Sequence, residues 1–165
     1  MYYTIDDFIK DWTAESDSTL KVFSNLTDDS LHQKVYDEGR TLGFLAWHIA
    51  STIGEMMQAA GLTIEGFDSE AEQPATAAEL VEKYSTFSNS LLKKVEAIPN
   101  ERLNEEFQMY GEVWKLMDIF KALVYHQIHH RGQMTVLMRQ AGVRVPGIYG
   151  PSKEEWGEFG MPAQK

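Results

Sequence analysis

Three of the five histidines in this 165-residue sequence crowd into one short segment, Tyr125-His-Gln-Ile-His-His-Arg-Gly-Gln133. If this segment is helical, His126 and His130 lie about 40° apart and one turn along, so both rings project from one face. The same face continues in both directions with residues of core type: Leu116, Ile119, Leu123, Gln133 or Met134, and Leu137. The histidine pair therefore occupies positions where a helical bundle normally buries leucine.

A third histidine has the same setting in a distant segment. His48 is flanked at helical spacing by apolar and small polar residues, Leu45, Ile49 and Thr52. A buried polar group without a partner costs about 1–3 kcal/mol, whereas one divalent metal ion satisfies three imidazoles at once. Three protein ligands with a fourth position left for water or substrate are typical of catalytic metal sites. The sequence predicts a mononuclear site of His48, His126 and His130.

Each histidine also has a simpler interpretation. The spacing His-x-x-x-His arises often by chance, and His48 alone fits a hydrogen-bonded core histidine. His129 can compete as a ligand through an i, i+3 pair with His126, although we expect it to face a helix neighbour or solvent. His32 lies in a polar connecting segment and receives no role.

The donor types narrow the choice of metal and of chemistry. Gln127 stands where zinc proteases of the His-Glu-x-x-His type carry their general base. The sequence has no cysteine, so thiolate ligands are excluded, and it lacks the paired Glu-x-x-His helices of di-iron bundles. An imidazole-rich site favours Zn or Ni, with Fe or Cu as alternatives, over Mg or Ca.

Polar residues near the histidines have two interpretations each. Glu55, seven residues after His48, is a candidate base or orienting residue, or else a solvated surface residue. Gln133, one turn past His130, orients a ligand ring or simply packs. Arg131 binds an anionic cosubstrate or, as we expect, pairs with an acidic neighbour.

The small and aromatic residues of this region carry weaker predictions. Gly132 costs about 1 kcal/mol in a helix interior, and a close approach by another helix would explain it. The aromatic residues Trp47, Trp114 and Tyr110 can line a pocket, although such residues at helical spacing more often belong to the core.

Four amphipathic segments are expected to position these residues, at about 4–24, 41–60, 77–97 and 112–141. Thr41 is an expected N-cap, Thr76 and Glu79 form a capping box, and Gly61 and Gly142 end their helices. The polar connections are 27–40, 62–75 and 100–111, in which 107–111 is a short extended piece or a hairpin. The tail, about 143–165, is expected to be irregular but to pack through its aromatic residues. The pattern predicts an all-α four-helix bundle in one domain, residues 1–165.

Charge and hydropathy exclude several classes of partner. The chain has 25 acidic and 15 basic residues and a net charge of −10, which disfavours nucleic-acid binding. Its N-terminus lacks the pattern of a secretory signal, and no apolar run approaches the ~18 residues of a membrane helix. We therefore expect a soluble cytoplasmic protein with no membrane partner.

The block His126-Gln-Ile-His-His130-Arg-Gly-Gln133, with Leu45-Ala-Trp-His48-Ile upstream and Tyr149-Gly-Pro in the tail, resembles the DinB/YfiT-like superfamily. The resemblance covers nearly the whole chain. It implies an up-down-down-up bundle, a divalent metal held by His48, His126 and His130, and a homodimer.

The resemblance implies a metal more firmly than a reaction. Some members of the superfamily are S-transferases that use small thiols such as bacillithiol or mycothiol, and others are thiol-dependent isomerases. The leading hypothesis is a metal-dependent transferase acting with a low-molecular-weight thiol and an electrophilic substrate. The alternatives are a metal-dependent hydrolase, or a non-enzymatic metal-stabilised bundle that serves a stress response or binds a small molecule.

Overall fold

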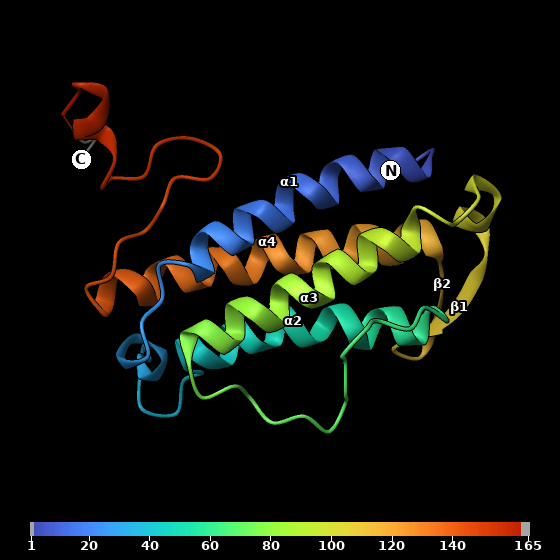
Figure 1. Ribbon diagram of the computed structural model, residues 1–165, viewed down its shortest axis with the longest axis horizontal. Coiled ribbons are helices and arrows are strands. Elements are labelled where there is room, and N and C mark those ends of the chain that lie inside the picture. The colour runs from blue at the N-terminus through green and yellow to red at the C-terminus, as the bar shows by residue number, and fades with distance from the viewer. Residues whose placement is uncertain (1, 163–165) are drawn as a thin grey trace.

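The computed structural model describes residues 2–162, and four long helices form its framework (Figure 1). They are α1 (Ile5–Phe23), α2 (Leu42–Ala59), α3 (Ala77–Val95) and α4 (Leu116–Gln140). The smaller elements are η1 (Asp29–His32), η2 (Asn100–Asn104), η3 (Trp156–Phe159) and the strands β1 (Glu106–Met109) and β2 (Glu112–Lys115). The prediction of a four-helix bundle is confirmed.

The helices follow the up-down-down-up order. α1 and α4 run in one direction and α2 and α3 in the other, because residues 60–76 cross back along the bundle before α3 begins (Figure 1). α2 packs against α3 and α4, and α1 packs against the same two helices. α1 and α2 therefore occupy opposite corners, and the α2–α4 contact is one of the four sides of the bundle.

Local hydrogen bonds explain where the helices begin and end. The hydroxyl of Thr41 accepts the backbone N–H at the third position of α2, and Thr76 and Glu79 form the reciprocal capping box. Gly61 and Gly142 each have a φ of +72°, the left-handed conformation that glycine adopts after a helix. These predicted caps are all confirmed.

The predicted apolar stripes form the core. In α3 all five stripe residues are buried, namely Leu80, Tyr84, Phe87, Leu91 and Val95. The corresponding stripe of α2, from Leu42 to Met57, is buried as well. Within residues 2–162, no helix is both long enough and apolar enough to cross a bilayer.

The predicted start of the fourth helix is wrong by four residues. α4 begins at Leu116, and residues 112–115 instead form β2, which pairs antiparallel with β1. Tyr110 (φ 50°) and Gly111 (φ 86°) make the two-residue turn, with the positive dihedrals that a tight hairpin needs. The hairpin, one of the two alternatives for residues 107–111, is thus present and extends to Lys115. The helix start was misplaced because Val113 and Trp114 are adjacent apolar residues that suit a strand as well as a helix.

The tail is irregular apart from η3, and it packs only in part. Val145 is buried and Ile148 contacts the core. Tyr149 and Phe159 are exposed, and η3 lies away from the bundle in Figure 1. The expected packing therefore holds for the first half of the tail; residues 163–165 lie outside the described part of the chain.

Candidate metal centre

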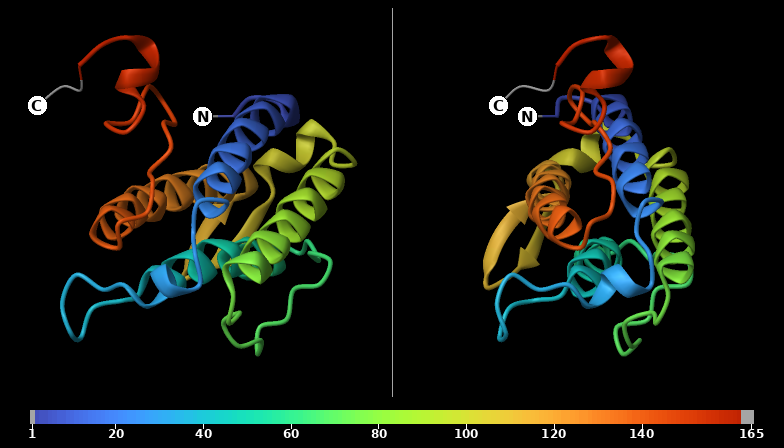
Figure 2. Two further views of the ribbon diagram at one scale, coloured as in Figure 1. Left: turned by 60° about the vertical axis from the view of Figure 1, so that its left-hand side comes forward. Right: turned by 90° about the vertical axis from the view of Figure 1, so that its left-hand side faces the viewer.

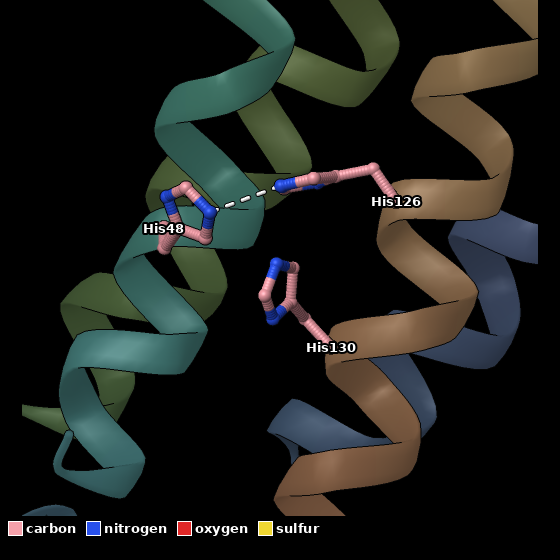
Figure 3. Close-up of side chains that lie close together, drawn as sticks. All are labelled: His48, His126 and His130. Carbon is pink, nitrogen blue, oxygen red and sulfur yellow. Dashed lines mark hydrogen bonds between the residues drawn. The ribbon is translucent and has the colours of Figure 1, made fainter. Parts of the chain in front are cut away.

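His48, His126 and His130 meet between α2 and α4, with their rings turned toward one another (Figure 3). One nitrogen of each ring lies within 4.8 Å of the others, and the Nε2 atoms of His48 and His126 are 2.9 Å apart. The structure thus brings together the three histidines that the sequence singles out. Their role as metal ligands stays a prediction.

The antiparallel packing of α2 and α4 produces this convergence. His126 and His130 are one helical turn apart, so both rings project from the same face of α4, and the His48 ring lies 4.7 Å from each of them. Leu45 and Leu123, each three residues before a histidine of the group, are buried in the core. His48 and His126 remain half-exposed, so the group borders solvent on its outer side.

Burial and mutual repulsion keep the imidazoles neutral. Desolvation, followed by the neighbouring His130 and His48, lowers the pKa of His126 to about 4. The pKa values of His48 and His130 are also lowered, chiefly by burial. Neutral rings keep a lone pair available, which is the form that binds a metal ion.

The hydrogen bonds of the group fit a bound cation. Nδ1 of His130 lies 2.7 Å from Oε1 of Gln133; donation of its proton there leaves Nε2 free to face the other rings. Nδ1 of His126 is buried, and among residues 2–162 it has no hydrogen-bond partner. Three neutral nitrogens and no carboxylate form a donor set that suits Zn, Ni, Fe or Cu.

Gln133 contacts the His130 ring, as one of its two expected roles requires, and His129 is exposed, as expected. The Gln133 side chain contacts two histidine rings. Its Oε1 lies 2.7 Å from Nδ1 of His130, and its Nε2 lies 3.1 Å from Nε2 of His129. His129 is exposed and lies outside the three-histidine group. His32, at the end of η1, is also exposed and belongs to no such group among the described residues.

Glu55 is a surface residue that nevertheless borders the site. It is exposed, accepts a hydrogen bond of 3.1 Å from the Tyr110 hydroxyl, and is not one of the converging residues. Its charge acts on His48, where it raises the pKa against the larger effect of burial. Burial and Glu55 together raise the pKa of Tyr110 to about 12, so this hydroxyl stays protonated and donates.

Arg131 faces the core and not the histidines. Its guanidinium is 3% exposed and lies 2.5 Å from the carboxylate of Glu15, with the Tyr149 hydroxyl 2.6 Å away. The expectation that Arg131 pairs with an acidic neighbour is confirmed. The ion pair links α4 to α1, and the Tyr149 hydroxyl, which contacts both side chains, joins the tail to it.

The explanation offered for Gly132 is wrong. A Cβ atom at this position would meet nothing within 4 Å, because residue 132 lies on the outer surface of α4. The close approach in this bundle occurs at Gly54, where a Cβ atom would lie 2.0 Å from the Phe67 ring. The bulky neighbour comes from the 60–76 crossover and not from another helix.

The three aromatic residues differ in their environment. Trp47 and Trp114 are half-buried, pack against the core and each line a surface cavity. Tyr110 is 64% exposed at the hairpin turn, so it is not a core residue. The hairpin brings it over α2.

Sequence reasoning missed two residues at the edge of the site. The Phe44 ring lies 5.9 Å from the His48 ring, and the guanidinium of Arg40 lies 4.9 Å from the Phe44 ring. Phe44 was detectable, because it precedes His48 by one helical turn. Arg40 carried no such signal, since its position depends on the path of the loop before α2.

A family model described as the DinB family matches residues 1–163. The chain belongs to the DinB family. Protein YrdA of Bacillus subtilis strain 168 is 40% identical over 166 residues, which span 100% of this DinB-family chain and 99% of YrdA.

Two solved structures relate this DinB-family chain to known folds. A DinB-like protein from Bacillus cereus ATCC 10987 is 37% identical, with a TM-score of 0.82 over 90% of this chain and 100% of that one. YfiT from Bacillus subtilis is 17% identical, with a TM-score of 0.66 over 84% of this chain and 87% of its own. YfiT is described as a probable metal-dependent hydrolase with an unusual four-helix bundle topology; at this identity the likeness concerns the fold.

Proposed function

We propose that this protein binds a divalent metal ion through His48, His126 and His130 and is a metal-dependent transferase acting with a low-molecular-weight thiol. The observation that carries the proposal is the convergence of three neutral imidazoles from two helices. His48 and His126 are only partly buried, which leaves one side of the group within reach of a small molecule, whereas His130 is buried. A purely structural metal would be expected in a closed site with a fourth protein ligand.

The donor set explains why a thiol is the favoured reactant. A divalent metal ion, when bound, lowers the pKa of a thiol and stabilises its thiolate for attack on an electrophile. Three neutral ligands do not offset the charge of the ion, so no separate base is needed in a site whose converging residues include no carboxylate. Gln133 orients the His130 ring, and Phe44 covers one side of His48.

A thiol-consumption assay tests the transferase. The zinc- or nickel-loaded protein is mixed with bacillithiol or cysteine and an electrophile such as an epoxide or an activated aryl halide. We expect turnover that His130→Ala removes and His32→Ala retains. Thiol consumption at the uncatalysed rate with every thiol and both metals would contradict the proposal.

Hydrolysis is the second candidate, and the position of Glu55 favours it. This carboxylate acts on His48 and is held by Tyr110, so it can accept the proton of an attacking water. The description of YfiT points the same way. In this case Glu55→Gln would abolish cleavage of a model ester, whereas a transferase would lose little activity from that change.

A further inference from the structure

We propose that Arg40 and the cavity beside it bind the anionic group of the substrate, so that the site takes a small molecule carrying a carboxylate or a phosphate. This inference rests on the proposed function, because it places the anion next to the three histidines. It assigns a role to Arg40 and specifies an anionic substrate, and neither follows from the histidines alone.

Arg40 differs from the other arginines in having no acidic partner. Four of the five arginines form ion pairs, namely Arg102, Arg131, Arg139 and Arg144. Among residues 2–162, no carboxylate oxygen lies within ion-pair distance of Arg40, although the protein has a net charge of −10. In so acidic a chain, an unpaired guanidinium at one place is available to an anion from solution.

Arg40 is linked to the three-histidine group by stacked side chains. Its guanidinium covers the Phe44 ring, which in turn stacks against His48. A fixed cation at this place opposes binding of a metal ion, and the repulsion is relieved when an anionic group lies between the two charges.

The cavity beside Arg40 shares one lining residue, Gln133, with the surroundings of the histidine group. It measures about 500 Å³ and is lined by residues of the loop 35–40, by Leu45 of α2, and by Gln133 and Leu137 of α4. The loop residues include Glu38, whose carboxylate is not within ion-pair distance of Arg40. Gln133 also contacts His130, so one side chain belongs to both. The two leucines offer apolar surface for the carbon skeleton of a ligand, and the volume suits a small molecule.

Two segments flank the outer face of α2 and α4. The loop before α2 and the β1–β2 hairpin both lie on the outer side of α2 and α4, as the right-hand view of Figure 2 shows. They stand at opposite ends of these helices in Figure 1. Arg40 therefore borders one end of the outer face and the Glu55–Tyr110 pair the other.

Two matched thiols test the inference on the cobalt-loaded protein. 3-Mercaptopropionate and 3-mercapto-1-propanol differ only in carboxylate against alcohol, and the visible spectrum of the metal reports their binding. We expect about tenfold tighter binding of the carboxylate, the effect of one charge-assisted hydrogen bond. Arg40→Gln removes this preference, and the exposed Arg144→Gln control keeps it.

Competition identifies the kind of anion. Inorganic phosphate and succinate are added against 3-mercaptopropionate, and the stronger competitor indicates a phosphate-bearing or a carboxylate-bearing substrate. Either outcome supports the inference when Arg40→Gln abolishes the competition. Competition that is equally strong in Arg40→Gln overturns it.

A second measurement needs no anion. Arg40→Gln should bind cobalt several-fold more tightly than the wild type at low ionic strength, because a repulsive charge is removed, whereas Arg40→Lys should not. Unchanged affinity together with an unchanged thiol preference overturns the inference and leaves the metal site standing. A wild-type protein that takes up no metal at all contradicts the proposed function instead.

Discussion

At the scale of single residues, the chemistry depends on imidazoles kept neutral by their surroundings. Burial and the proximity of the other rings lower the pKa of all three histidines, most of all that of His126. The same surroundings leave Nδ1 of His126 without a partner among the described residues. The other ring nitrogen, Nε2 of His126, lies 2.9 Å from Nε2 of His48, where one cation would satisfy both rings.

The three-histidine group predicts how single substitutions change the amount of bound metal. We expect His48→Ala and His130→Ala to abolish stoichiometric binding of zinc or nickel, because two imidazoles alone form a weak site. His32→Ala is the matched control and should retain the full metal content, since His32 lies in η1. Elemental analysis of the dialysed proteins measures this. A full equivalent of metal in either ligand variant would refute the assignment.

The metal-free protein should lose stability on acidification. His126 has its pKa lowered from 6.5 to about 4 in the folded state, so the unfolded chain binds more protons between these values. The free energy of unfolding should therefore fall as the pH drops from about 6.5 to about 4. Urea titrations of the chelator-treated protein measure the slope, and His126→Asn should reduce it. An equal slope in that variant would argue against His126 as its source.

At the scale of elements, close packing concentrates where the crossover contacts α2. Gly54 lets Phe67 lie directly on the helix, and Phe67 in turn packs against Phe87 of α3. The 60–76 segment is thereby attached to two helices. This attachment supports the parallel arrangement of α2 and α3.

Two glycine substitutions should have opposite effects. Gly54→Ala forces Phe67 away and should destabilise the protein by about 1–3 kcal/mol, as overpacking does. Gly132→Ala meets no atom within 4 Å and should stabilise it by about 1 kcal/mol through helix propensity. Denaturant unfolding of both variants checks this. A loss of stability in Gly132→Ala would show that residue 132 has a contact partner after all.

At the scale of the whole molecule, the acidic surface determines which partners can approach. With a net charge of −10, the protein repels polyanions, and Arg40, which forms no ion pair within residues 2–162, lies beside the histidines. We expect no measurable affinity for duplex DNA at physiological salt. A gel shift at low and at physiological salt measures this, and tight, salt-sensitive binding would overturn the expectation.

Periodicity made the bundle and the three histidines predictable. The stripe of α4 runs through His126 and His130 because local spacing alone decides which residues share a helix face. The hairpin was less predictable, since Val113 and Trp114 fit either a strand or a helix until Tyr110 and Gly111 adopt the turn. The role expected for Gly132 failed because spacing cannot tell an exposed glycine from one that another element covers.

By itself, the sequence determined the four helices, their caps and their buried faces, because these depend on neighbours a few residues away. It also predicts the donor types of the metal site. Only the tertiary structure decided that α2 packs beside α4, which places His48 against residues about 80 positions later in the chain. It also decided that Arg131 faces Glu15, that Tyr110 reaches Glu55, and that Arg40 borders the site. These contacts depend on loop paths and helix packing, which local patterns do not encode.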